Sequence, residues 1–528
     1  MISIRRLPRL RGKGSSDPAA PARNFKEDDF GPQSLFSREP TDFDLITQLT
    51  HMSAVATSGL ARDRLFEHTA ELDYSTSKYF RRVHRVAQRL NYDYSQACEI
   101  VGEQAKVESV QNLLLHFATA LSAGESEAAF LARETEVQLE LFGKKYERDM
   151  ESLRKWTDAY IALMVSTTLI VVISLVSMMI YPVGTIAIAG LALVVMLVTA
   201  AGGWIIFTVA PHDVKTHRLA RRSAEQAQME RLAIVLITVT GPVFVLGWLL
   251  FNLGIAMIVS SLLLTPIAWL VWQDDKKIDQ RDNDMPAFLR GLGSVMGAVG
   301  TTVGEGLSRL NRRSLGAMEM HVRKLYVRLT NDLPPEMTWA RLAGETGSEL
   351  VTRTVRIFSD GIKVGGDPAA VGELASSFGQ KVALLRASRA LVSNSFAFVV
   401  VPMHAALLGI ILFVTEVVLI FGGKIAEVQE QNLDSDLIAE AGVSNAIVFA
   451  APDSGFIRML VVVSIIMLTL ANSFAPYAAS GGHRYKIFNF AVIMMLISGV
   501  SYIVIPEVVQ GLFASVAETP TAGGTPIQ

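Results

Sequence analysis

The chain has 528 residues, of which 50% are hydrophobic and 19% are charged, and its formal net charge is -2. Its mean hydropathy of +0.35 is too high for an ordinary soluble protein. The single cysteine, Cys98, excludes an intrachain disulfide. Nucleic-acid binding is not expected, because the chain has no basic face interleaved with aromatic residues.

Residues 1–41 are rich in proline, glycine, serine and charge, which predicts a flexible arm. No apolar run follows its first basic residues, so the arm does not resemble a cleavable secretory signal. A basic arm of this kind suits an anionic cytoplasmic leaflet. Its basic residues near the start are Arg5, Arg6, Arg9, Arg11 and Lys13.

Seven stretches are long and apolar enough to cross a membrane as helices, which satisfy their backbone hydrogen bonds internally. The first four are predicted to form two hairpins within residues 156–273, and the last three fall within residues 391–510. The seven stretches are 159–180, 185–209, 232–251, 254–272, 396–421, 457–479 and 487–508.

Charge in the connections predicts the orientation of the spans. The connections 212–231 and 483–486 carry an excess of Lys and Arg, which marks them as cytoplasmic. The connection 424–455 is acidic and is expected outside the cell. We therefore expect a multi-pass protein of the cytoplasmic membrane with its N-terminus inside, its C-terminus outside and a disordered tail over 511–528.

Two helical domains are expected on the cytosolic side, at residues 42–155 and 274–390. In the first, apolar residues recur at helical spacing from Leu45 to Ala56. In the second, Pro286 is expected to open a helix with the same spacing. The predicted fold class is all-α, a polytopic membrane protein with about seven transmembrane helices and two helical bundles.

The two domains share landmarks at a nearly constant separation, which suggests duplication. Gly59 and Gly300 are 241 residues apart. The Gly124-Glu125 pair and the Gly366-Asp367 pair are 242 residues apart. A basic helical segment at 80–83 matches 322–325 at the same separation of 242.

Each domain resembles the type II secretion system F-domain family, in which a helix ends at a small residue and glycine and a later Gly-acidic turn opens another helix. Two such domains in one chain are similar to the platform proteins of the archaellum and of type IV and Tad pili. The segments that carry the resemblance are 52–66, 120–132, 285–307 and 361–374.

The resemblance implies a mechanical platform at the base of a filament machine. It implies a hexameric secretion ATPase and pilin-like filament subunits as partners, with the lipid membrane around the spans. It leaves open whether the chain forms a homodimer. It also implies that the chain has no active site of its own.

No catalytic motif argues against that expectation. The chain lacks a complete phosphate-binding Gly-x-x-x-x-Gly-Lys-Ser/Thr loop. It also lacks the His-x-x-x-His and Cys-x-x-Cys spacings of zinc sites. We therefore expect no catalytic residues, no metal and no cofactor.

Candidate partner-binding residues are charged side chains in the predicted cytosolic segments. The simpler interpretation of the cations is that they orient the spans. The acidic candidates each follow a glycine and precede a helix, where capping is the simpler explanation. The candidates are Arg218, Arg221, Arg222, Lys276, Lys277, Arg281, Glu125 and Asp367.

Two ionisable residues, His404 and Glu416, lie within the fifth predicted span. Such groups are costly in lipid unless they face protein or water. One interpretation is an ion path, which makes an ion-coupled secondary transporter the alternative function. The other is that His404 pairs with a neighbouring helix and Glu416 lies near the outer interface.

Overall fold

The computed structural model describes residues 41–180, 185–217, 219, 221–432 and 454–517. Regular structure over these residues is helical, with no strand and one isolated bridge between Thr216 and Ser348. The predicted all-α class is therefore confirmed. The expectations for the arm, for most of the acidic connection and for the end of the tail lie outside the described residues.

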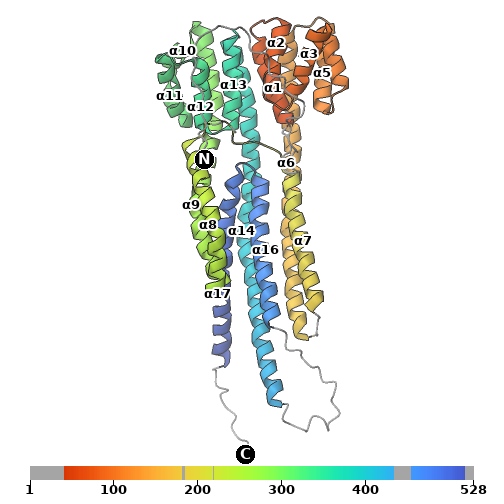
Figure 1. The fold of residues 1–528 in the computed structure, drawn as a ribbon, viewed down its shortest axis with the longest axis vertical. Helices are drawn as coiled ribbons and strands as arrows, with labels where there is room; N and C mark the ends of the chain where they lie inside the picture. The colour runs from red at the N-terminus through yellow and green to blue at the C-terminus, as the bar shows by residue number, and fades with distance from the viewer. Residues whose placement is uncertain (1–40, 181–184, 218, 220, 433–453, 518–528) are drawn as a thin grey trace, which may run out of the picture. The chain divides into compact units, whose positions relative to one another are not determined.

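The helices fall into two sets of short helices, each ending in a long helix, together with further long helices (Figure 1). The first set comprises α1 (Thr41–Ala56), α2 (Arg62–Ala70), α3 (Ser77–Leu90), α4 (Tyr94–Glu103), α5 (Glu108–Ser122) and α6 (Glu127–Ile180). The second set comprises α9 (Leu253–Val299), α10 (Val303–Arg309), η1 (Arg312–Met318), α11 (Glu319–Thr330), α12 (Pro335–Thr346), α13 (Glu349–Lys363) and α14 (Pro368–Asn432). The others are α7 (Thr185–Val209), α8 (Ala224–Leu250), α16 (Ser454–Ser480), η2 (Arg484–Lys486) and α17 (Ile487–Ala517).

Six helices in the described part of the chain are long and apolar enough to cross a membrane: α6, α8, α9, α14, α16 and α17. They coincide with six of the seven predicted spans. The remaining predicted span corresponds to α7, whose searched apolar part, Leu193–Val209, is shorter than a span requires. That seventh span stays a prediction. Helix α17 continues past residue 511, where the tail was expected to begin.

Three helices run without a break from the short helices into the apolar spans: α6, α9 and α14 (Figure 1). The expectation that Pro286 opens a helix is wrong, because Pro286 lies inside α9. Proline is costly there, since it lacks an N–H and its ring crowds the preceding turn. The buried ring packs beside Gly379 of α14, where a Cβ would lie 3.3 Å from the ring Cγ.

Helix starts in the two sets keep one separation along the chain. Arg62 and Val303, Glu108 and Glu349, and Glu127 and Pro368 are each 241 residues apart and each begin a helix. Gly59 and Gly300 both adopt positive φ, at 67° and 66°. We call these two sets the first and second repeats.

The predicted register needs correction at the later glycine. Gly124 and Gly365 share a positive φ, at 76° and 87°, so Gly124 corresponds to Gly365. The separation there is 241 residues, as at the helix starts, rather than 242.

Helix α1 packs into both repeats at once. Leu45, Leu49 and Met52 belong to the core of the first repeat, whereas Phe43 and Ile46 belong to the core of the second. Its apolar residues therefore occupy two faces, and the helix is buried almost throughout.

Polar side chains of α1 are satisfied by α13 of the second repeat. Arg353 donates to Thr47 at 3.0 Å, pairs with Asp44 at 2.7 Å and stacks on the Phe43 ring, 4.2 Å from its centroid. His51 is bonded to Asp360 at 3.0 Å. Buried polar groups require such partners, so the contact between the repeats is specific as well as apolar.

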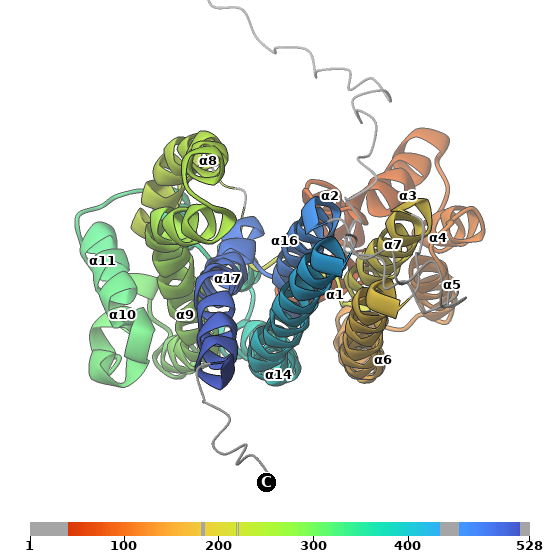
Figure 2. The same ribbon diagram turned by 90° about the horizontal axis from the view of Figure 1, so that it is seen from below.

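The long helices pack as neighbours, as the view from below shows (Figure 2). Helix α8 lies along α9, and α17 packs against α9 and α14. Helix α16 packs against α14 and α7, and α6 packs against α7. Gly254 and Gly499 allow α9 and α17 to approach closely, because a Cβ on either would lie within 3.0 Å of the other's carbonyl oxygen.

A buried polar cluster ties four of these helices together. His404 of α14 is bonded to Asn472 of α16 and to Ser498 of α17, both at 2.9 Å. Tyr160 of α6 donates to the Asn472 side chain at 3.0 Å. The interpretation that His404 pairs with a neighbouring helix is therefore confirmed. Glu416 accepts a hydrogen bond from Gln510 at 3.3 Å.

The crossing of α9 and α14 in the second repeat generates a test. A Cβ on Gly293 would lie 2.4 Å from the Pro368 carbonyl oxygen and 2.9 Å from the Gly372 Cα. We expect Gly293→Ala to lower the melting temperature in detergent, because overpacking costs about 1–3 kcal/mol. Gly241→Ala is the control, since a Cβ there meets nothing within 4 Å. Equal melting temperatures for both variants would contradict this packing.

Candidate functional site: a buried ion-pair junction

The segment that links α7 to α8 is bound to the second repeat. The Glu349 N–H donates to the Lys215 carbonyl at 3.0 Å, and His217 Nε2 donates to the Gly344 carbonyl at 3.1 Å. Burial lowers the pKa of His217, which keeps the ring neutral and suits this hydrogen bond. A connection between two apolar helices is thus held against α12 and α13.

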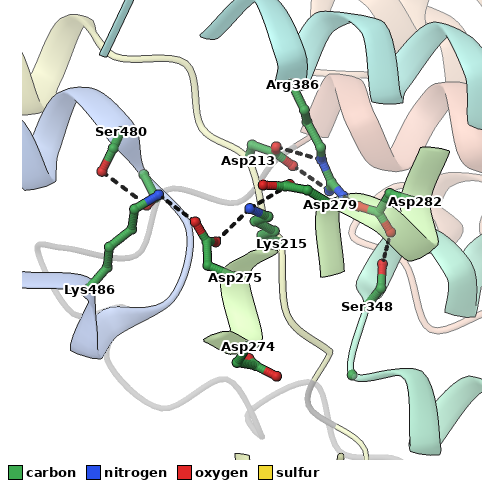
Figure 3. Close-up of polar contacts among 12 residues, drawn as sticks. Asp213, Lys215, Asp274, Asp275, Asp279, Asp282, Ser348, Arg386, Ser480 and Lys486 are labelled. Atoms are coloured by element: carbon green, nitrogen blue, oxygen red, sulfur yellow. Dashed lines mark hydrogen bonds and ion pairs between the residues drawn. The ribbon is translucent and has the colours of Figure 1, made fainter. Parts of the chain in front are cut away.

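Arg386 of α14 is the centre of the first half of the site (Figure 3). Its guanidinium donates two parallel hydrogen bonds to Asp213, both at 2.8 Å, and a third to Asp282 of α9 at 2.7 Å. The Ser348 hydroxyl donates to the other oxygen of Asp282 and caps α13 by accepting from the Val351 N–H at 3.2 Å. One planar cation therefore joins α14, α9 and the linking segment.

Lys215 is the centre of the second half (Figure 3). Its ammonium contacts Asp275 at 2.5 Å and Asp279 at 2.7 Å, both on α9. Lys486, at the start of α17, donates to the second oxygen of Asp275 at 2.8 Å. These pairs connect the linking segment and η2 to α9.

Arg389, one helical turn after Arg386, binds helix ends rather than carboxylates. It donates to the carbonyls of Ala479 at 3.0 Å and Pro211 at 2.7 Å. A cation at the C-terminal end of α16 is favourable because the last carbonyls lack helical partners. Gly481 is required next to it, since its φ is 62° and a Cβ would lie 2.5 Å from the guanidinium.

We call these side chains the junction network: Asp213, Lys215, Asp275, Asp279, Asp282, Arg386, Arg389 and Lys486. Burial alone would raise the pKa of Asp213, but Arg386 outweighs it, and the pKa lies below its ordinary value. Burial would lower the pKa of Lys215, but Asp275 and Asp279 raise it above its ordinary value. Both groups are therefore charged at neutral pH.

The network holds elements together and offers no reactive group. Its carboxylates are engaged by cations, so none is free to act as a general base. Among the described residues, no group of three or more His, Cys, Asp and Glu side chains could hold a metal ion. Paired buried charges of this kind fix the relative positions of α9, α14, α16 and α17.

Several predicted partner-binding cations gather around the start of α8. Arg222 pairs with Glu230, and Lys277 pairs with Glu225 at 2.6 Å. Arg221 and Lys276 are exposed, and Lys276 lies 5.3 Å from the centroid of the Trp272 ring.

Two further cations give no exposed surface in the described structure. Arg281 is buried and donates to the Thr346 carbonyl at 2.6 Å, so its side chain supports the fold rather than a partner surface. Arg218 lies outside the described residues.

The two acidic candidates make local contacts at helix starts. Asp367 caps α14 by accepting from the Ala370 N–H at 3.1 Å. Glu125 does not cap α6: it pairs with Arg133 at 2.7 Å, and Ser126 accepts from the Ala129 N–H at 3.3 Å. The capping explanation is confirmed for Asp367 and wrong for Glu125, because the cap is one residue later.

Sequence reasoning missed the junction network because it treated membrane-proximal cations as orientation signals. Asp274, Asp275 and Asp279 follow directly after an apolar span, where unpaired carboxylates are costly. Arg386 and Arg389 share one face of a helix that enters the next span. Opposite charges at the ends of two spans were the available signal.

Comparison with known proteins adds one consistent result. The chain is 22% identical over 433 residues to flagella accessory protein J of Methanocaldococcus jannaschii, covering 78% of this chain and 74% of the relative. It is 20% identical over 436 residues to flagella accessory protein J of Methanococcus voltae, covering 80% and 77%. The chain resembles archaeal flagella accessory protein J.

The predicted resemblance to the archaellum assembly protein J is therefore confirmed. The matches to flagella accessory protein J extend over more of the chain than either half contains, so the similarity is not confined to one repeat. No known family model matches the chain. No solved structure matches it.

Removal of the central cation should destabilise the protein strongly. We expect Arg386→Met to cost about 3–5 kcal/mol, because it leaves the buried Asp213 and Asp282 carboxylates uncompensated. Arg290→Met removes an exposed pair with Glu373 and should cost about 0–1 kcal/mol. Thermal unfolding in detergent measures both. A similar melting temperature for the two variants would argue against the junction.

The lowered pKa of Asp213 predicts a dependence on acid pH. A carboxylate whose pKa falls on folding stabilises the protein above its ordinary value of 3.8, and this contribution is lost as the pH falls through the folded-state pKa. The melting-temperature difference between wild type and Asp213→Asn should therefore shrink below about pH 4. The exposed Asp73→Asn is the control. A difference that does not change with pH would contradict the assignment.

Proposed function

We propose that this chain is the membrane platform of an archaellum or a related type IV pilus-like filament. In this role it couples a hexameric cytosolic ATPase to the extraction and polymerisation of pilin-like subunits. The similarity to two flagella accessory proteins J, over more than three quarters of the chain, carries the proposal. The six long apolar helices support the location in a membrane.

The two repeats face the cytoplasm in this proposal. The Lys- and Arg-rich connections 212–231 and 483–486 support that orientation through the positive-inside rule. The connection between α14 and α16 then lies outside the cell, as does the C-terminus. The exposed side chains of Arg221 and Lys276 lie on the cytosolic surface near the membrane.

Force passes from the repeats to the spans through helices. An ATPase that displaces the repeats acts directly on α6, α9 and α14, because each continues into a span without a break. The junction network carries the same displacement to α16 and α17 through Arg389 and Lys486. A rigid, fully paired junction suits this role better than a mobile one, because slack would dissipate the motion.

Filament subunits meet the outer faces of the spans. Helix α8 packs mainly along α9, and its other faces present large apolar side chains. Lipid and the apolar helix of a subunit are both compatible with such a surface. The exposed residues of α8 include Ile234, Val235, Leu249 and Leu250.

A salt-dependent binding measurement tests the proposal. Arg221→Glu with Lys276→Glu should weaken binding of the full chain in nanodiscs to the hexameric ATPase of the same machine. The remaining wild-type binding should fall as salt rises, because exposed charges are screened within about 10 Å at 0.1 M. The variant should also lose filaments in cells.

A matched double reversal controls for added acidic charge. Arg89→Glu with Arg323→Glu changes two exposed cations in the repeats, away from the start of α8, and should leave binding unchanged. Equal loss in both variants would indicate a non-specific charge effect. Filament formation without the chain would refute the platform role.

A further inference from the structure

The first repeat is closed by a small group of polar contacts at its helix starts. Arg62, which begins α2, pairs with Glu127 at the start of α6 at 2.5 Å and lies 3.7 Å from Asp93, the residue that caps α4. The Tyr94 hydroxyl donates to Asp63 at 2.6 Å. We call these five residues the clasp.

The second repeat lacks every member of the clasp. At the constant separation of 241 residues, the corresponding positions carry no ionisable side chain and no hydroxyl. No ion pair or side-chain hydrogen bond equivalent to the clasp can therefore form there. The corresponding residues are Val303, Gly304, Pro334, Pro335 and Pro368.

All five of these residues line one open cleft in the second repeat, with a cavity volume of about 1150 Å³. The cleft therefore opens where the first repeat is clasped. The walls come from the end of α9, the start of α10, and α12 and α13. Its apolar lining includes Met296, Trp339, Val355, Phe358 and Ile362.

The rim of the cleft carries charge that balances. Glu336 of α12 pairs with Lys363 of α13 at 2.6 Å, and both side chains are mostly exposed. Arg356 and Asp360 lie 3.7 Å apart on α13. Exposed pairs of this kind contribute about 0–1 kcal/mol, so the Glu336–Lys363 pair opens at little cost. A neutral rim over an apolar wall selects an apolar occupant rather than a charged one.

The first repeat indicates what fits such a position. There the aromatic ring of Tyr94 is buried and stacks on Phe66, with ring centroids 4.5 Å apart. Its counterpart in the second repeat is Pro335, which brings no aromatic ring. An aromatic side chain supplied from outside would meet Trp339 and Phe358, whose rings lie 5.8 Å apart in an edge arrangement.

We propose that the cleft of the second repeat is a docking site for an apolar segment of a partner protein that inserts an aromatic side chain. The proposal rests on the assembly role above only for its cellular readout. Because the rim is neutral, this docking is insensitive to salt. It is therefore separable from the salt-dependent surface around Arg221 and Lys276.

Indole is the probe for the cleft itself. The full chain in nanodiscs is labelled with 5-fluorotryptophan, and Trp339→Phe identifies the fluorine signal of Trp339. We expect indole to shift that signal saturably, whereas partition of indole into lipid produces no saturation. The shift should be lost in Ala340→Phe, which places a ring at the cleft wall. It should persist in Met320→Phe, a matched change at an exposed residue of α11 outside the lining.

Filament formation tests whether a partner uses the cleft. Ala340→Phe should abolish filaments with an unchanged melting temperature, and Met320→Phe should retain them. A second variant closes the cleft differently: Val303→Arg with Pro368→Glu rebuilds the Arg62–Glu127 pair of the first repeat. It should also abolish filaments, and it decides the matter if Ala340→Phe is unstable.

Three outcomes would overturn the proposal. The first is the absence of a saturable Trp339 shift in the wild type. The second is normal filament formation by both closed variants. The third is a saturable shift that appears only after residues 1–40 are deleted, which would assign the cleft to the chain's own arm. If cells without the chain still build filaments, the platform role fails, while the indole titration still decides whether the cleft accepts an aromatic group.

Discussion

The arrangement of the spans beneath the second repeat depends on one constraint, that a buried guanidinium must be fully paired. Arg386 meets this constraint with Asp213 and Asp282, which come from different parts of the chain. Each carboxylate would be costly if left alone in the same place. Because the donors of Arg386 lie in one plane, the linking segment, α9 and α14 have little freedom to shift relative to one another. A platform that passes displacement from helical domains to membrane helices needs this property.

Duplication gave this chain two versions of one helical unit with different surroundings. The first begins with α1, a separate helix buried between both repeats, whereas the second begins with α9, which arrives directly from an apolar span. This difference accounts for the unequal number of spans predicted after each repeat. It also accounts for the different fates of the helix starts. They are clasped by Arg62 in the first repeat and open to a cleft beside Val303 in the second.

Sequence reasoning succeeded where a feature depends on neighbouring residues and failed where it depends on distant ones. The spans, the glycine turns and the cap at Asp367 are local, and the structure has them close to their expected positions. Pro286 was misread because a proline usually marks a helix start, and the space beside Gly379 that accommodates its ring is not visible in the sequence. Arg281 was grouped with surface cations because charge alone does not reveal burial. His404 was left between two interpretations until its partners on α16 and α17 were identified.

The apolar runs, their lengths and the constant separation of 241 residues are properties of the linear chain. They were sufficient for an all-α membrane protein with a repeated helical unit, since hydrophobic length and helical period act locally. The pairing of Arg386 with Asp213, the sharing of α1 between two cores and the opening of the cleft could not be derived in this way. Each depends on residues more than a hundred positions apart that meet only when the helices pack. The energies of burial and charge pairing that decide such meetings are set by the three-dimensional surroundings, not by the order of the residues.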